Sequence, residues 1–165
     1  MLDGSCVTYY VKDGVFGVCS RNLDLLEDEN NSMWKFVTTS GLKERLLALE
    51  RNIAVQGEII GEGIQGNPYK IIGQTVRLFN GFDIDKYEYL SLDDLLKLSK
   101  WLEVKTVPIL DLEFRLPDTI DELLSYADSK SVLNEKFDRE GVVIRSHDRK
   151  ISFKVISNKF LLNEK

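Results

Sequence analysis

The stretch that decides the fold is IAVQGEIIGEGIQGN, residues 53–67. Its first half is apolar and led by β-branched residues, a pattern typical of a buried strand, and Glu58 interrupts that strand just before a loop with three glycines. A buried carboxylate costs free energy unless something pairs with it. Two interpretations of Glu58 therefore stay open. It is either an edge-strand residue that faces water, or a ligand-binding carboxylate at a strand end, where glycines let the backbone approach a nucleotide or nucleic acid closely.

Further strands are predicted on both sides of this stretch. The segments with a strand pattern are residues 6–11, 15–21, 75–84, 107–112, 140–145 and 150–157. The turn sequence Lys12-Asp13-Gly14 joins the first two into a hairpin, and Gly81 marks a bulge in the third. The turn between the last two carries the only histidine, His147, for which we predict no catalytic role.

Helices are predicted between these strands. They span residues 31–52, with an interruption near residues 39–41, residues 91–102, and a segment that begins at Thr119. Ser40 is the predicted N-cap after the interruption, and Thr119 with Glu122 fits a capping box. Because helices are inserted between antiparallel-type strands without a βαβ rhythm, the sequence predicts the α+β class: a single domain, 1–165, of antiparallel or mixed sheets flanked by helices.

The composition limits the choice of partners. A chain of 165 residues with 43% hydrophobic and 30% charged residues is long enough for one domain with its own core. The net charge of -5 provides no basic field for nucleic acid, so such a partner must meet a local group of Lys and Arg, or bind through metal ions. Two cysteines indicate reduced thiols, and we find neither a signal peptide nor a membrane-spanning run. We therefore expect a cytoplasmic protein without membrane contact.

Polar residues that a packed sheet would not choose lie at five strand ends: the Asp3-Gly4 start, Arg21, Glu58, Glu140 and Lys154. Phe82-Asp83 adds an aromatic ring next to a carboxylate. Arg21 has an alternative role, which is to pair with the acidic loop of residues 24–29. Together these residue types are what a nucleoside phosphate requires. An aromatic ring stacks on the base, carboxylates accept from ribose hydroxyls and hold a divalent metal, and cations neutralise phosphate oxygens.

These residues belong to six short motifs that follow one another in order: Leu2-Asp3-Gly4, Ser20-Arg21-Asn22, Gly57-Glu58-Ile59, Phe82-Asp83-Ile84, Glu140-Gly141-Val142-Val143 and Phe153-Lys154. The series resembles the motifs of the covalent nucleotidyltransferases, the superfamily of ATP-dependent RNA and DNA ligases and mRNA capping enzymes. Residues 61–65 and 153–160 are similar to RNA ligases of the phage double-strand-repair type. The resemblance covers nearly the whole chain and implies a ligase-type nucleotidyltransferase domain, unrelated to the ATP-grasp fold.

The resemblance also implies a role for each of five residues. Arg21 contacts the ribose or the incoming RNA end, Glu58 binds a ribose hydroxyl, and Phe82 stacks on adenine. Glu140 supports the metal ion and the phosphate, and Lys154 binds the α-phosphate. The implied substrates are ATP and RNA ends, with Mg²⁺ or Mn²⁺. In this family a lysine amine attacks the α-phosphorus of ATP, AMP passes to a 5′-phosphate, and a 3′-hydroxyl then seals the RNA.

Met1 occupies the position of the family's nucleophilic lysine, the first residue of Lys-x-Asp-Gly. A thioether cannot form a phosphoramidate, so we expect self-adenylylation to be impaired in this chain. The α-amino group of Met1 has a suitable pKa of about 8, but it lies on the backbone, short of where a lysine side chain delivers its nitrogen. Sealing of RNA that already carries a 5′-adenylate does not need the lysine.

Both ends of the chain depart from the family pattern. The abrupt start favours truncation over a natural loss of the first step. Only eleven residues follow Lys154, which leaves no room for the OB-fold domain of DNA ligases and capping enzymes. Ile156 stands where the family has a second lysine, and Lys159 is out of register.

Three hypotheses follow for the function. The first is an ATP-dependent RNA ligase domain that joins 5′-phosphate and 3′-hydroxyl ends of a nicked duplex or a broken RNA, as a monomer. The second is a non-catalytic remnant that binds a nucleotide or RNA without turnover. The third is a relative of the capping guanylyltransferases, which a preference for GTP over ATP would favour.

Overall fold

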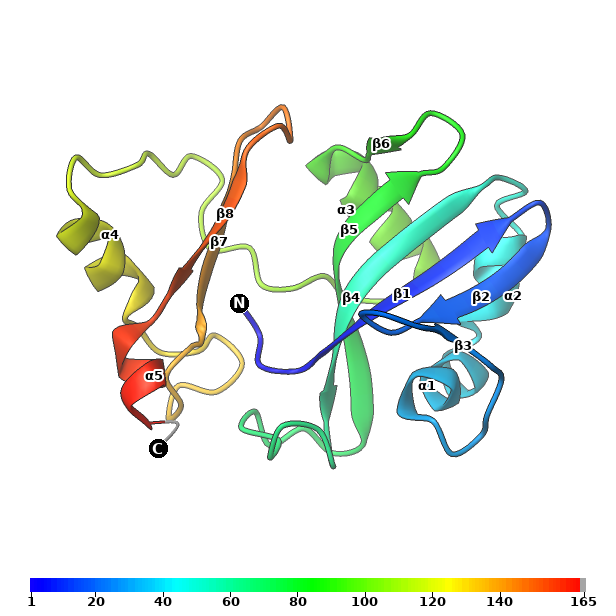
Figure 1. The fold of residues 1–165 in the computed structure, drawn as a ribbon, viewed down its shortest axis with the longest axis horizontal. Coiled ribbons are helices and arrows are strands. Elements are labelled where there is room, and N and C mark those ends of the chain that lie inside the picture. Colours follow the sequence, from blue (N-terminus) through cyan, green and yellow to red (C-terminus); the bar gives the residue numbers. More distant parts are fainter. Residues whose placement is uncertain (164–165) are drawn as a thin grey trace.

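The structure is a computed structural model, and it describes residues 1–163. Its largest element is a six-stranded sheet in the order β3-β2-β1-β4-β5-β6, in which every neighbouring pair is antiparallel (Figure 1). The strands are β1 (Ser5–Lys12), β2 (Val15–Cys19), β3 (Asp24–Leu25), β4 (Ile53–Gly61), β5 (Gln74–Asp83) and β6 (Glu88–Tyr89). Because β4 lies between β1 and β5, the interpretation of Glu58 as an edge-strand residue is wrong.

Three helices cover one face of this sheet: α1 (Ser32–Ser40), α2 (Leu42–Leu47) and α3 (Leu92–Leu102). Alternate residues of the strands, such as Val7, Val55 and Leu78, are fully buried against apolar side chains of these helices. The residues between them point to the opposite face, which none of these helices covers. We call this second face the open face; it carries Cys6, Gln56, Glu58, Asn80 and Phe82.

A smaller unit follows in the last third of the chain. It consists of α4 (Ile120–Ala127), a two-stranded sheet of β7 (Gly141–Arg145) and β8 (Ser152–Ile156), and α5 (Asn158–Asn163). Ala127 packs on Val142 and Val155, so α4 covers one face of the hairpin. In Figure 1 the N-terminus lies between this hairpin and the six-stranded sheet. Within residues 1–163 no helix is long and apolar enough to span a membrane.

Several local predictions are confirmed. Asp13 and Gly14 both have positive φ, 52° and 77°, as expected for the two-residue turn of the first hairpin. Ser91 caps α3, and Thr119 with Glu122 forms the complete capping box of α4. The α+β class with antiparallel sheets is confirmed as well.

Three local predictions are wrong. Ser40 ends α1 and does not cap α2, because Gly41 at φ 68° stands at that N-cap; Asn31 caps α1 instead. The bulge of β5 lies between Leu78 and Asn80, opposite Gln56 and Gly57, and not at Gly81. A Cβ at Gly81 would lie 2.6 Å from a methyl carbon of Leu90, so packing explains this glycine.

The predicted strand over residues 107–112 is also absent from the described chain. A single bridge joins Thr106 to Leu78, and the amide of Val107 donates to the carbonyl of Leu78 at 2.8 Å. Pro108 follows and has no amide proton to donate, so the ladder ends there.

Candidate active site

Five of the six sequence motifs come together where the open face of the large sheet faces the β7–β8 hairpin, and the Phe82-Asp83-Ile84 motif lies farther along the sheet. The amino group of Met1 donates to the carbonyl of Gly141 at 2.5 Å, which brings together residues 140 positions apart. Burial lowers the pKa of this amino group to about 6, and the charges of Glu140, Arg139, Lys154 and Glu58 also act on it. Four separate segments of the chain therefore place charged groups around one point.

Glu58 has a raised pKa at this site. Burial and the nearby carboxylate of Glu140 raise the pKa of Glu58 to about 7, and Asp3 adds to this effect. Lys154 and the amino group of Met1 act in the opposite direction. Crowded carboxylates in a partly buried position favour a bound cation or hydrogen-bond donors such as ribose hydroxyls.

A glycine lets the first motif approach Glu58 closely. A Cβ at Gly4 would lie 2.5 Å from the carbonyl oxygen of Ile59 and 2.7 Å from Cγ of Glu58. A Cβ at Gly57, on the buried face, would lie 2.8 Å from the carbonyl oxygen of Arg77. The amide of Asp3 donates to the hydroxyl of Tyr69 at 2.5 Å. Gly4 therefore leaves room for the Glu58 side chain beside the first motif.

Lys154 and Arg21 reach the same region from opposite sides. Burial raises the pKa of the Cys6 thiol, as does Glu58, whereas Lys154 and Arg21 lower it. Cys6 is paired with Glu58 across β1 and β4, so both cations lie near the first strand of the open face. Among residues 1–163 Arg21 forms no ion pair with the acidic loop after it, and its alternative structural role has no support.

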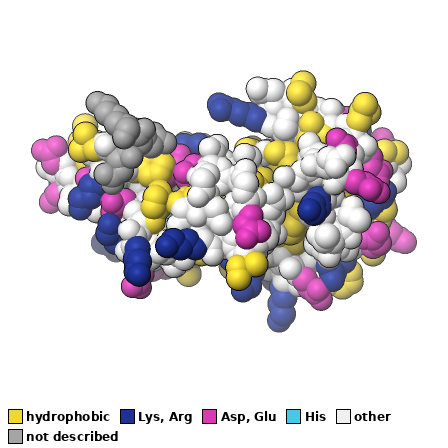
Figure 2. Space-filling model, turned by 90° about the horizontal axis from the view of Figure 1, so that it is seen from below, with side chains coloured by type: hydrophobic (Ala, Val, Ile, Leu, Met, Phe, Trp, Pro, Cys, Tyr) yellow, Lys and Arg dark blue, Asp and Glu magenta, His cyan; other side chains and the backbone are white. Residues whose placement is uncertain are grey.

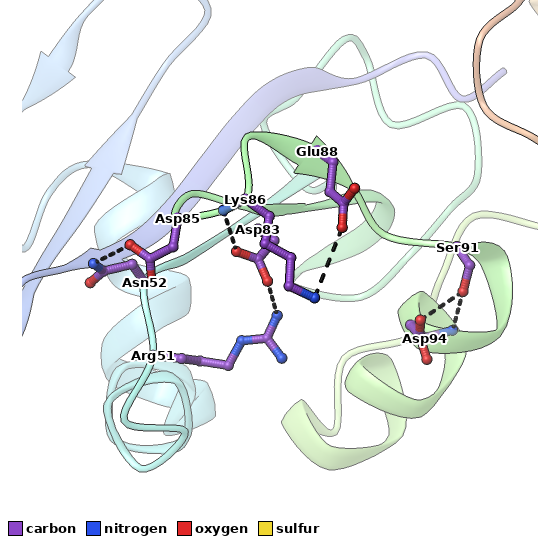
Figure 3. A network of polar contacts seen from close by, with 8 residues as sticks. All are labelled: Arg51, Asn52, Asp83, Asp85, Lys86, Glu88, Ser91 and Asp94. Carbon is purple, nitrogen blue, oxygen red and sulfur yellow. Dashed lines mark hydrogen bonds and ion pairs between the residues drawn. The ribbon is translucent and has the colours of Figure 1, made fainter.

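Phe82 and Asp83 lie farther along the sheet. Phe82 is paired with Ala54, four strand positions from Glu58, and its ring meets those of Tyr87 and Tyr89 edge to face at 5.4 and 5.1 Å. Asp83 bonds Arg51 at 3.1 Å and accepts from the amide of Lys86 at 3.0 Å, in the network that Figure 3 shows. Asp83 is therefore a structural residue. The role of Phe82 in adenine stacking stays a prediction.

Several residues at this site were not predicted from the sequence. Arg145 donates to the carbonyl of Phe79 and to Oδ1 of Asn80, both at 2.7 Å, and its guanidinium lies 6.0 Å from the centre of the Phe79 ring. The amide of Asn80 then donates to Gln56 at 3.0 Å. This chain of contacts links β7 to the open face. No local sequence pattern signals it, because the partners are 65 positions apart.

Ile156, which stands at the position of the family's second lysine, is the last residue of β8, and Lys159 belongs to α5. Ile156 is paired with Gly141, and the amide of Lys159 donates to Asp128 at 3.3 Å. His147 lies exposed in the β7–β8 turn, away from the motif residues, as predicted. Cys6 and Cys19 are both free thiols.

The described residues hold no group of three His, Cys, Asp or Glu side chains arranged to bind a metal ion. Glu58, Asp3 and Glu140 nevertheless interact as crowded carboxylates. A divalent cation held by Glu140 here would take its remaining ligands from phosphate oxygens of a nucleotide and from water. A separate cavity of about 510 Å³ lies beside the start of α1, lined in part by Met33, Ile64 and Gln65, and the predicted catalytic residues do not line it.

The model of one protein family, described as RNA ligase, matches residues 2–157. The chain belongs to the RNA ligase family. This match spans nearly all of the chain and includes all six motifs, so it supports the first of the three hypotheses over a capping-enzyme relationship. Among curated proteins no match is found.

Solved structures agree with this family assignment. An RNA ligase mutant of Naegleria gruberi with ATP and Mn is 46% identical with a TM-score of 0.91, and the match covers 99% of this chain and 50% of that one. A second mutant of that ligase, with AMP and Mn, is 46% identical with a TM-score of 0.92, over 99% and 49%. The same ligase with PPi is 46% identical with a TM-score of 0.91, over 99% and 49%. The chain thus spans about half the length of these relatives.

Proposed function

We propose that this chain is the nucleotide-binding catalytic domain of an ATP-dependent RNA ligase, which joins a 5′-phosphate to a 3′-hydroxyl through enzyme-AMP and RNA-adenylate intermediates. The observation that carries the proposal is the meeting of the Met1 amino group with Glu58, Glu140 and Lys154 around one point. Family membership and the similar Naegleria structures with ATP, AMP and PPi support it. RNA ends and ATP are the proposed partners, and a monomeric, cytoplasmic state stays a prediction.

Each of the meeting residues has a role in this proposal. Glu58, held by Gly4 and β4, accepts hydrogen bonds from ribose hydroxyls once it is ionised. Lys154 binds the α-phosphate, and Arg21 binds the ribose or the incoming RNA end. Phe82 stacks on adenine, and Phe79 is a second aromatic side chain on the same strand, nearer to Glu58.

Glu140 and the carboxylates near it would hold a divalent cation together with phosphate oxygens of ATP. When bound, Mg²⁺ or Mn²⁺ supplies positive charge to the phosphates as pyrophosphate leaves. The protein's own part is to orient the nucleotide between two sheets and to place Lys154 against the α-phosphate. The crowding that raises the pKa of Glu58 is relieved by the cation.

Met1 determines which steps of the ligase reaction this chain can carry out. The thioether has no amine with which to attack the α-phosphorus, so self-adenylylation through this side chain does not occur. The final step remains, because the 3′-hydroxyl attacks a preformed RNA adenylate and AMP leaves. In this proposal the chain therefore seals pre-adenylated RNA.

A sealing assay with pre-adenylated RNA and Mg²⁺ or Mn²⁺ tests this. The expected result is a joined product that needs the metal and is lost in Lys154→Ala. Tight binding of ATP without any joined product, at enzyme concentrations above that of the RNA, would instead favour the second hypothesis of a binding remnant. Binding of GTP in preference to ATP would contradict the RNA ligase assignment.

A further inference from the structure

A group of aromatic side chains lies at the end of the open face, outside the roles assigned so far. Tyr87 precedes the short edge strand β6 and Tyr89 is its second residue, and these two residues are 85% and 50% exposed. Both rings meet Phe82 edge to face, so Phe82 supports them from the sheet side. Exposed aromatic rings gathered around one residue offer faces on which a flat ligand can stack.

Arg145 lies near Tyr89 and near a second arginine, Arg149. Arg145 stands at the end of β7, and Arg149 in the following turn; Figure 1 shows this turn and β6 at the same end of the molecule. Arg145 donates to Asn80 at 2.7 Å, and Tyr89 is paired with Phe82, two positions along the same strand, so Arg145 and Tyr89 lie over one end of the open face. Burial lowers the pKa of Arg145, Arg149 lowers it further, and Tyr89 acts to raise it. We call Tyr87, Tyr89, Arg145 and Arg149 the tyrosine–arginine rim.

The rim carries positive charge that the described residues do not neutralise. Neither arginine forms an ion pair within residues 1–163, although the chain has 27 acidic and 22 basic residues. On the face that Figure 2 shows, by contrast, basic and acidic side chains are interspersed. Arg145 donates to Phe79 and Asn80 through one guanidinium nitrogen, Nη1, so the positive charge of both arginines remains available to attract an anion.

We propose that the tyrosine–arginine rim binds one or two unpaired nucleotides of the RNA substrate, with bases stacked on Tyr87 and Tyr89 and the backbone phosphate held by Arg145 and Arg149. Aromatic faces stack on any base, and arginines bind phosphate in a forked geometry, so this combination suits single-stranded RNA. The inference rests on the proposed function, since it names where the RNA of the ligase reaction lies. The rim adjoins Phe82, the proposed adenine-stacking residue, and would place this RNA beside the nucleotide.

Binding of a labelled, 5′-phosphorylated single-stranded RNA to the 165-residue chain tests this, with ATP binding measured in parallel. We expect Tyr87→Ala with Tyr89→Ala to weaken RNA binding by about 10-fold to 100-fold and to weaken ATP binding by a much smaller factor, because both rings contact Phe82. Tyr87→Phe with Tyr89→Phe should retain most RNA affinity, because the rings remain. Trp101→Ala removes another exposed aromatic side chain, on α3, and is the matched control.

The arginines are tested through the dependence of RNA binding on salt. Arg149→Ala should reduce the slope of log affinity against log salt concentration by about 0.7, whereas Arg115→Ala, an exposed arginine elsewhere, should leave it unchanged. Unchanged RNA binding in the tyrosine variant would overturn the proposal. So would an equal loss of RNA and ATP binding, which would assign the rim to the ATP site.

Two further outcomes separate this proposal from the proposed function. If the parent chain binds ATP and seals pre-adenylated RNA but the rim variants retain full RNA affinity, only the rim proposal fails. If the parent chain binds neither ATP nor RNA, the proposed function fails and the rim proposal fails with it. Equal unfolding midpoints for all variants show that each loss is local.

Discussion

A Cβ atom at residue 4 would lie 2.7 Å from Cγ of Glu58, closer than real side chains pack. The first motif and the third are therefore in direct contact, and Gly4 is small because the Glu58 side chain fills the space beside it. This contact explains why a glycine follows Asp3 at the start of β1.

Gly4→Ala is expected to destabilise the chain by about 2 kcal/mol and to weaken ATP binding, because Glu58 or the Ile59 backbone must move. Urea unfolding and a nucleotide titration measure the two effects. Gly14→Asn in the first hairpin turn is the control, since nothing lies within 4 Å of a Cβ there and Asn tolerates its positive φ. If the Gly4→Ala variant is destabilised but binds ATP as the parent does, Gly4 is not needed for nucleotide binding.

The raised pKa of Glu58 predicts a specific pH dependence of stability. Between its ordinary value of 4.5 and about 7, the folded chain keeps a proton that the unfolded chain releases, so the free energy of unfolding falls as pH rises. The groups that face it are Glu140, Asp3, Lys154 and the Met1 amino group. Because Glu58 is partly exposed, solvent screening limits the loss to about 1–2 kcal/mol.

Glu58→Gln should remove this loss, so the variant should be more stable than the parent at pH 8 and equally stable near pH 4. Denaturant unfolding across this pH range measures it. Glu62→Gln, an exposed glutamate in the following loop, should keep the slope of the parent. A Glu58→Gln curve parallel to that of the parent would show that Glu58 has an ordinary pKa.

The contact between Arg145 and Asn80 predicts that the two sheets are energetically coupled. Arg145→Ala, Asn80→Ala and the double variant should give a coupling energy of about 1–2 kcal/mol in urea unfolding. Arg145→Ala combined with Arg115→Ala should be additive, because the second arginine lies elsewhere. Additive effects at Arg145 and Asn80 would mean that the 2.7 Å hydrogen bond contributes nothing to the docking of the hairpin.

Asp83 is a carboxylate that we expect to be needed for stability and not for ATP binding. Asp83→Ala breaks the bonds to Arg51 and to the Lys86 amide, and should cost about 1–3 kcal/mol while ATP binding is retained. Glu88→Ala should change stability by less than about 0.5 kcal/mol, since its ion pair with Lys86 is exposed and 4.0 Å long. If the Asp83→Ala variant is stably folded but no longer binds ATP, Asp83 belongs to the nucleotide-binding site.

Much of this fold follows from local sequence signals. The turn at Asp13-Gly14, the caps at Ser91 and Thr119, and the alternation in β1 and β4 depend on near neighbours, so the pattern predicts them. The motif order located the polar strand ends that meet in space. The bulge of β5 was wrongly predicted at Gly81 because its position depends on the pairing with β4, whereas local features, Gly41 and Pro108, explain the errors at Ser40 and at residues 107–112.

The contacts that form the site cannot be predicted from neighbouring residues in the sequence. The choice between a water-facing and a ligand-facing Glu58 depended on β4 being central, which the sequence of β4 does not encode. Arg145, Asn80 and Tyr69 act across distances of 65 or 66 positions in the chain. Their roles became visible only once the hairpin and the large sheet were placed face to face.

Intact-mass measurement after incubation with ATP and Mn²⁺ or Mg²⁺ tests the central claim most directly. Two chains are compared, each with the same short upstream extension: one with Met1→Lys and one that keeps Met1. The account predicts a gain of one AMP, about 329 Da, in the lysine chain alone, and loss of that gain when Lys154→Ala is added. Addition of AMP to neither chain, with both folded, would contradict the claim that these residues form the adenylylation site of an RNA ligase.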